Sequence, residues 1–197
     1  KRAFSSIERR LFMGAAGVNV VSEGFPSYFQ TEGIDTARWS FFPNGVDQEF
    51  INFEPEKIGP SPVCKTVLYA GNIGSGQGLE SIIPKIAKQL EDSFRFVVVG
   101  GGGTEALLKE AVEREEVNNV EMVAPVSRIE LKEYYQKADF LFLHLNDVSA
   151  FRRVLPSKIF EYAALGKPIV AGLSGYSTTF LEKQLPYASL FEPGDSE

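Results

Sequence analysis

Four glycines stand in one loop directly after an apolar run, a pattern typical of loops that bind phosphate groups. The apolar run covers residues 67–70, and the loop continues to residue 78. Small residues let the backbone approach a ligand, and N–H groups at the start of a following helix can face a phosphate. We therefore expect a ligand contact here, with a flexible turn as the alternative. The residues assigned to this contact are Gly71, Asn72, Ile73, Gly74 and Gln77.

A second candidate segment, Leu155–Pro168, places a lysine and a glutamate on one short helix. Ser157 is a good N-cap residue for that helix, and we assign it and Pro156 to the same ligand contact. Lys158 lies in the first turn, where the helix dipole disfavours a cation, and this indicates an anionic partner. Glu161 could accept hydrogen bonds from two hydroxyls of a ribose. From the residues alone, a solvated Lys and Glu on an amphipathic helix is the alternative.

A third glycine run follows the apolar residues 96–99. Gly101, Gly103 and Ala106 formally satisfy the dinucleotide-binding fingerprint. The acidic residue that should end the next strand is absent there, because Glu121 lies inside that strand. The run therefore favours a tight turn beside a ligand, to which we assign Gly100 and Gly101, and an NAD(P) site is a minor alternative.

Two further places follow apolar runs. Val126, in the loop 124–128, could face a flat base or belong to a plain loop. His144 follows the run 140–143, and a structural role and a place beside the ligand are equally favoured.

The elements that must position these residues alternate along the chain. From about Cys64 onward, continuously apolar runs alternate with amphipathic helical patterns, as in parallel strands covered on both faces. This order predicts an α/β fold with a doubly wound parallel sheet. Ligands of such sheets bind beyond the carboxyl ends of the strands, where all of the loops described above would meet. The strand-like runs are residues 67–70, 96–99, 120–123, 140–143 and 169–171.

Composition excludes several classes of function. The 197 residues carry a formal net charge of -6, which argues against duplex nucleic acid as the main partner. Cys64 and His144 are the single cysteine and histidine, so we expect no internal disulfide and no metal site. No apolar run approaches the roughly 20 residues of a membrane span, and we expect a cytoplasmic location. The chain begins without Met and stops soon after the run 188–191, so we expect both ends to be cut inside a larger protein.

Five loose motifs in a fixed order give the chain its resemblance to a known family. It resembles the nucleotide-sugar-binding half of a retaining glycosyltransferase of the GT-B fold, family 4 (also called group 1). Within that family it is similar to the bacterial surface-polysaccharide branch that includes fucosamine transferase-like proteins. The motifs are Val20–Gly24, Pro43–Asp47, Tyr69–Gly74, Val98–Gly102 and Leu155–Pro168.

The resemblance implies a division of the chain into three parts. Residues 1–42 would be the end of an N-terminal acceptor domain, and residues 43–63 the interdomain linker and entry segment. Residues 64–197 would form a Rossmann-like C-terminal domain that binds the nucleotide sugar and is truncated at its end. The fragment alone would then be inactive, because most of the acceptor domain is missing.

The resemblance also implies roles for the candidate residues. Glu161 would hold the ribose, the loop 71–78 would face the diphosphate, and Val126 would line the base. Two departures from the family pattern matter. Arg153 stands where many members have a glutamate, and Asn72 and Gln77 stand where many have an arginine and a lysine. We expect Arg153 and Lys158 to replace the missing phosphate-binding cations, and we take these two residues and Glu161 as the catalytic set.

The implied reaction moves a sugar from a nucleoside-diphosphate sugar, such as a UDP-sugar, to a saccharide acceptor with retention. The acceptor would be lipid-linked, in the synthesis of capsule or lipopolysaccharide, with peripheral contact at the inner face of the cytoplasmic membrane. No cofactor or metal would be required. The alternatives are a nucleotide-sugar epimerase of the GT-B fold, an NAD(P)-binding oxidoreductase domain and a non-catalytic nucleotide-binding module.

Overall fold

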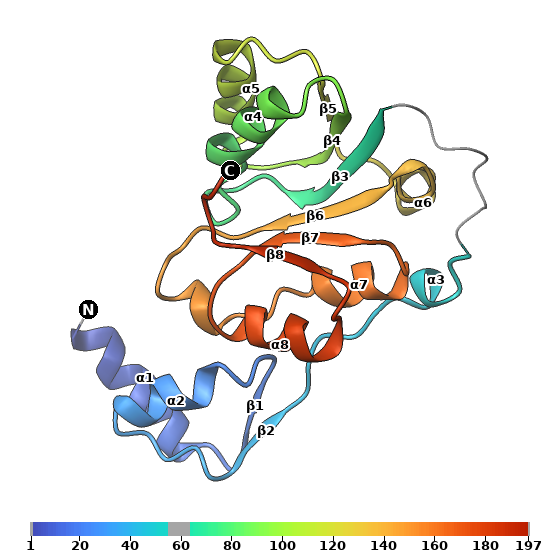
Figure 1. Ribbon diagram of the computed structural model, residues 1–197. Coiled ribbons are helices and arrows are strands. Elements are labelled where there is room, and N and C mark those ends of the chain that lie inside the picture. Colours follow the sequence, from blue (N-terminus) through green and yellow to red (C-terminus); the bar gives the residue numbers. More distant parts are fainter. Residues whose placement is uncertain (1, 55–63, 197) are drawn as a thin grey trace.

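The predicted doubly wound α/β sheet is confirmed, and all of its strand pairs are parallel. The computed structural model describes residues 2–54 and 64–196. The strands are β3 (Lys65–Asn72), β4 (Phe94–Gly101), β5 (Val120–Val123), β6 (Phe140–His144), β7 (Ile169–Gly172) and β8 (Ser189–Phe191). They pair in the order β5-β4-β3-β6-β7-β8, shown in Figure 1. The chain therefore leaves β3 on one side, reaches β5, and crosses back to β6 on the other side.

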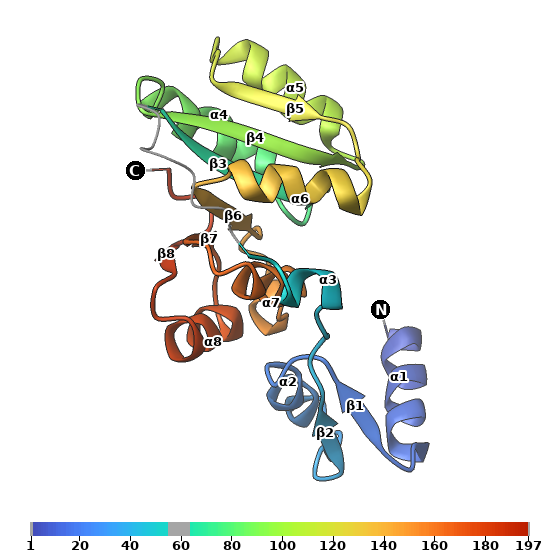
Figure 2. The same ribbon diagram turned by 90° about the vertical axis from the view of Figure 1, so that its right-hand side faces the viewer.

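Helices cover both faces of this sheet (Figures 1 and 2). One face carries α4 (Leu79–Gln89) and α5 (Glu105–Arg114), and the other carries α6 (Arg128–Lys137), α7 (Lys158–Ala164) and α8 (Tyr176–Gln184). Within β3, Val67 and Tyr69 join the core under α4, while Leu68 and Ala70 join the core under α6 and α7. A strand buried on both faces needs apolar residues at every position, which explains the continuous apolar runs.

The two central strands separate partway along their length. β3 and β6 pair only at Val67↔Phe140 and Leu68↔Leu141. Beyond that point the hydroxyl of Tyr162, from α7, donates to the carbonyl of Phe142 and accepts from the amide of Ala70, both at 3.3 Å. The tyrosine thus satisfies backbone groups that the ladder no longer pairs, and the strands diverge into a crevice at their carboxyl ends.

The N-terminal segment has a small sheet of its own. It contains α1 (Arg2–Gly14), β1 (Val18–Val20), α2 (Phe25–Thr31), β2 (Trp39–Phe41) and α3 (Gln48–Ile51). β1 and β2 pair in parallel. The rings of Phe12, Phe29 and Trp39 pack against one another with centroids 4.8–5.1 Å apart. None of the helices in the described ranges has the length and apolar character that a membrane span requires.

Three contacts join this N-terminal segment to the rest of the chain. Two of them involve a residue shortly before α7, and the third involves the first residue of α8. The Ser22 hydroxyl donates to the carbonyl of Arg153 at 2.5 Å, next to the single-turn 3-10 helix η1 (Phe151–Arg153). The Tyr176 hydroxyl donates to the carboxylate of Glu23 at 2.9 Å. The Arg153 guanidinium lies 3.9 Å from the centre of the Tyr28 ring. The division at residues 42 and 63 stays a prediction, and residues 55–63 of the expected linker lie outside the described part of the chain.

Candidate functional site

The crevice at the reversal of strand order contains two adjoining hollows. This is where ligands bind in open α/β sheets. Each hollow encloses about 300 Å³, and both are lined by Ala70, Gly71, Asn72 and Lys158. The first also has Val99, Gly100, Gly101, Pro125, Val126 and Leu131 in its wall. The second also has Tyr69, Gln77, Leu143, His144, Leu145, Phe151, Val154, Pro156 and Ser157. A larger hollow of about 370 Å³ under α6 lies near the amino ends of β3–β5, away from Lys158.

Lys158 stands where the two hollows meet. It is the only Lys or Arg that lines either of them among residues 2–54 and 64–196. Its ammonium donates to Oε2 of Glu161 at 2.9 Å, and about a quarter of its side chain is exposed. Because Lys158 opens α7, the helix dipole opposes its charge, and the carboxylate one turn away offsets that effect. The arrangement keeps a cation beside a cavity large enough for an anionic ligand.

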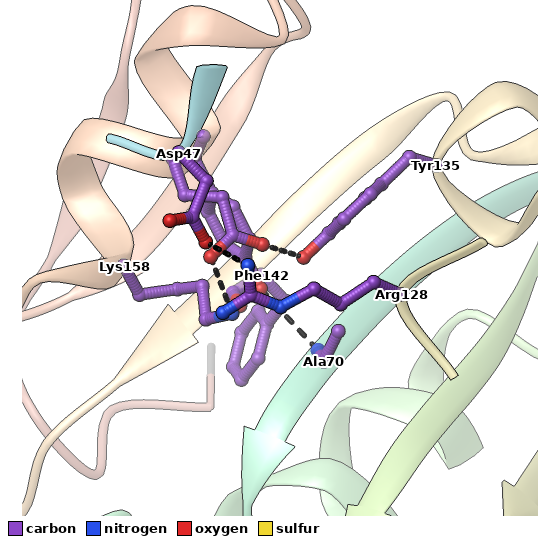
Figure 3. A network of polar contacts seen from close by, with 8 residues as sticks. Asp47, Ala70, Arg128, Tyr135, Phe142 and Lys158 are labelled. Atoms are coloured by element: carbon purple, nitrogen blue, oxygen red, sulfur yellow. Dashed lines mark hydrogen bonds and ion pairs between the residues drawn. The ribbon is translucent and has the colours of Figure 1, made fainter. Parts of the chain in front are cut away.

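Glu161 is held between two donors. The Tyr135 hydroxyl donates to Oε1 and the Lys158 ammonium donates to Oε2. The two donors come from different elements, Tyr135 from α6 and Lys158 from α7, and both are labelled in Figure 3. Burial, together with the charge of Glu161, raises the pKa of Tyr135, so its hydroxyl stays protonated as a donor. Glu161 is not among the residues that line the two hollows, and its contact with a ribose stays a prediction.

The first glycine loop is closed by its own side chains. Oε1 of Gln77 accepts from the amide of Gly74 at 3.2 Å and from the side-chain amide of Asn72 at 3.1 Å. The end of β6 fixes the other half of the loop, because Asn146 donates to the carbonyls of Ser75 (2.6 Å) and Gly76 (2.9 Å). The loop is therefore held in place rather than a loose turn. A diphosphate that binds here meets two amide side chains and Lys158.

The remaining predicted residues fall into two groups. Val126, Gly100 and Gly101 line the first hollow, and Pro156 and Ser157 line the second. Ser157 stands at the expected start of α7, but its hydroxyl accepts no capping hydrogen bond, so the predicted capping interaction is wrong.

Four predicted residues are not among those that line the two hollows: Gly74 and Glu161, described above, and Ile73 and Arg153. Ile73 is 1% exposed and belongs to the core under α4. Arg153 stacks on Tyr28 and is part of neither wall. Its role as a phosphate ligand stays a prediction. Lys158 is better placed for that role, because it lines both hollows.

An NAD(P) site would need an acidic residue at the end of β5. Glu121 instead lies near the start of that strand, where it forms an ion pair with Arg95 near the start of β4. That position is far along both strands from the crevice. No group of three or more His, Cys, Asp or Glu side chains that could hold a metal ion occurs in the described ranges.

Sequence reasoning missed the tyrosines that build the wall of the site. The sequence pattern gives Tyr135 a place on an apolar helix face and gives Tyr162 no role, yet their hydroxyls contact Glu161 and the diverging strands. A tyrosine at a position that periodicity predicts to be buried is the available signal, because a buried hydroxyl requires a partner. The sequence does not say which partner it has.

His144 joins the glycine loop to the segment after β8. Its Nε2 accepts from the amide of Gly194 at 3.0 Å, so Nδ1 carries the proton and donates to the carbonyl of Gln77 at 2.6 Å. The ring is fully buried and packs in one cluster with Phe142 and Phe191, with the three ring centroids 6.0–6.3 Å apart. Burial lowers the pKa of His144, while the bond to Gln77 and the charge of Glu80 oppose this weakly. The histidine is therefore a neutral structural bridge at the edge of the site.

His144 predicts a specific loss of stability in mild acid. Because the pKa of His144 is lowered in the folded chain, the unfolded chain takes up this proton at a higher pH, so the free energy of unfolding should fall as the pH drops below 6.5. The slope expected for one group is at most about 1.4 kcal/mol per pH unit. Urea unfolding between pH 7.5 and 5.5 measures it. His144 is the only histidine, so His144→Gln should remove most of this dependence of the unfolding free energy on pH. An unchanged slope in that variant would show that other groups cause the dependence.

Comparison with known proteins gives consistent matches to one family. The model of "Glycosyl transferases group 1" matches residues 64–197. A curated protein of Escherichia coli (strain K12), "Putative colanic acid biosynthesis glycosyl transferase WcaI", is 29% identical over 181 residues, which cover 88% of this chain and 44% of that protein.

Solved structures share the fold at low identity. Anabaena HepE in complex with UDP has a TM-score of 0.80 at 18% identity, covering 100% of this chain and 55% of that one. WaaG, a glycosyltransferase involved in lipopolysaccharide biosynthesis, has a TM-score of 0.73 at 17% identity, covering 97% and 54%. The chain spans about half the length of these proteins.

Proposed function

Because the chain belongs to the glycosyl transferases group 1 family, we propose that its crevice binds a nucleoside-diphosphate sugar. We propose further that the complete protein transfers the sugar to a saccharide acceptor. One observation carries the proposal: Lys158 lies where two hollows meet at the reversal of strand order. Anabaena HepE has been solved in complex with UDP, with UDP and glucose, and with UDP-glucose, which supports UDP as the first nucleotide to test.

The two hollows suit the two ends of such a ligand. The diphosphate lies beside Lys158, with the nucleoside in the hollow of Gly100, Gly101 and Val126. The sugar then occupies the hollow that contains Gln77 and Ser157, which offer an amide and a hydroxyl for hydrogen bonds. Each hollow alone has the volume of a small ligand site.

The proposed chemistry is transfer with retention of anomeric configuration. The bond from the anomeric carbon to the diphosphate breaks and leaves its electron pair on the departing phosphate oxygen. That oxygen takes the proton of the acceptor hydroxyl as the hydroxyl oxygen bonds to the same face of the sugar. Lys158 stabilises the charge that builds on the diphosphate, a term that typically dominates such reactions.

The names of two relatives support an acceptor from surface-polysaccharide synthesis. WcaI is named for colanic acid and WaaG for lipopolysaccharide. We propose a saccharide acceptor of this kind, lipid-linked and used at the inner face of the cytoplasmic membrane. We assign the residues of the two hollows to the donor.

A melting-shift panel tests the donor site directly. UDP, GDP, ADP, pyrophosphate and NADH are added separately to the purified protein. A ligand at a hundred times its dissociation constant stabilises the fold by about 2.7 kcal/mol, which corresponds to roughly 5–10 °C for a chain of this size. We expect this shift from one nucleoside diphosphate and its loss in Lys158→Ala. A shift with NADH and with none of the diphosphates would contradict the proposal.

A further inference from the structure

The hydroxyl of Tyr135 holds the carboxylate of Glu161, whose other oxygen accepts from Lys158 where the two hollows meet. Tyr135 is 0% exposed inside α6, and its hydroxyl donates to Oε1 of Glu161. We propose that Tyr135 is a positioning residue that orients Glu161 toward the two ribose hydroxyls of the bound nucleotide. This inference rests on the donor site proposed above.

The lone pairs of the carboxylate suit this role. A carboxylate offers about four acceptor positions on its two oxygens. Tyr135 occupies a position on Oε1 and Lys158 one on Oε2. One position on each oxygen remains, which matches the two donors of a vicinal diol. Because burial raises the pKa of Tyr135, the hydroxyl donates throughout the physiological pH range.

Lys158 cannot hold Glu161 alone once a ligand is present. It lines both hollows, and a diphosphate there competes with Glu161 for its ammonium. Tyr135 lines neither of the two hollows and donates to the oxygen of Glu161 that Lys158 does not contact. Its hydrogen bond therefore persists when Lys158 turns to the phosphates, and it keeps the carboxylate in one orientation.

The ring of Tyr135 is fixed by aromatic neighbours on two elements. It meets Phe50 of α3 edge-on, with centroids 5.8 Å apart, and Tyr162 of α7 in the same way at 6.2 Å. Two ion pairs fasten the α3 segment to α6: Arg128 with Asp47 at 2.6 Å (Figure 3) and Lys132 with Glu49 at 3.7 Å. A buried ring between two edge-to-face partners has little freedom to turn, so the hydroxyl presents one direction to Glu161.

A pair of ligands that differ only in the ribose tests the inference. Calorimetry compares UDP with 2′,3′-dideoxy-UDP, or the corresponding pair for another base if the panel selects it. The variant is Tyr135→Phe, which removes one hydroxyl at nearly constant volume. Tyr134→Phe, at the next position in α6, is the matched control because Tyr134 does not contact Glu161. Tyr135→Met fills the same space if the phenylalanine variant does not fold.

We expect Tyr135→Phe to weaken UDP binding about tenfold, the typical effect of a hydrogen bond to a charged group. Binding of the dideoxy ligand should stay unchanged, and Tyr134→Phe should bind both ligands like the parent protein. An equal loss for both ligands in Tyr135→Phe, or no loss for either, would overturn the inference.

Failure of the donor site would look different. If the parent protein bound no nucleoside diphosphate, both the proposed function and the inference would fall. If it bound UDP with a ribose preference that Glu161→Gln abolishes and Tyr135→Phe leaves intact, only the inference on Tyr135 would fall.

Discussion

Replacing Lys158 by alanine in the complete protein should lower the rate of sugar transfer by about 100- to 1000-fold. Lys158 is the only Lys or Arg lining either hollow in the described part of the chain, so the diphosphate would lose its one cationic contact there. The charge on that diphosphate is largest in the transition state, so the rate should fall more than donor affinity. Release of the nucleoside diphosphate from a sugar nucleotide in the presence of acceptor measures the rate.

Stability should change little in the same variant. Lys158→Ala removes the pair with Glu161, but it also removes a cation from the start of a helix, and Glu161 keeps its bond to Tyr135. Opposing changes of this kind leave a net effect of about 1 kcal/mol or less. Lys137→Ala is the matched control, because Lys137 is exposed on α6 and pairs with Glu133. Full turnover in Lys158→Ala would refute the assignment of the diphosphate to this residue.

Arg153 was predicted to share the phosphate role with Lys158, and the same assay separates them. In the structure its guanidinium rests on Tyr28, and its carbonyl accepts from Ser22. A cation over an aromatic face at this distance contributes about 0.5–1 kcal/mol at an exposed site. If Arg153 only joins the two segments, Arg153→Ala should cost stability of that order. If it leaves Tyr28 for the diphosphate, its loss should lower turnover as much as loss of Lys158.

The sequence was sufficient for those parts of the site that depend on strand order. Parallel strands present their carboxyl ends on one edge, so the loops at Gly71, Gly100 and Val126 had to lie near one another once the alternation was recognised. Lys158 could be added because a cation at the start of a helix needs an anion. Both arguments use local pattern and a topological rule.

The parts that the sequence does not reveal depend on where single side chains turn. Nothing in the spacing says that Gln77 folds back onto Gly74, or that Arg153 turns to Tyr28 more than 100 positions earlier. Ser157 has the residue type of a cap, yet it adopts a helical backbone and makes no capping bond. The Tyr135–Glu161 contact joins two helices whose relative placement follows from packing of the whole core. Local propensity carries no information on such long-range pairs.

Replacing Gly100 by alanine should destabilise the fold strongly. A Cβ at Gly100 would lie 1.9 Å from the carbonyl oxygen of Gly71, its partner across the β3–β4 ladder, and Gly100 has a φ of +146°. The obstructing atom is backbone in a central strand, so relief requires the two strands to part. We expect the free energy of unfolding to fall by about 3 kcal/mol or more, read as a shift in the urea midpoint.

Gly103→Ala is the matched control for that variant. Gly103 lies in the same glycine run, but a Cβ there meets nothing within 4 Å, and its φ is not positive. If the glycine at residue 100 served only to leave room for a ligand, Gly100→Ala would be as stable as Gly103→Ala and would lose only nucleotide binding. If strand approach requires the glycine, Gly100→Ala alone should be destabilised, with or without nucleotide. The structure favours the second outcome, because the atom that excludes a side chain at residue 100 belongs to the protein itself.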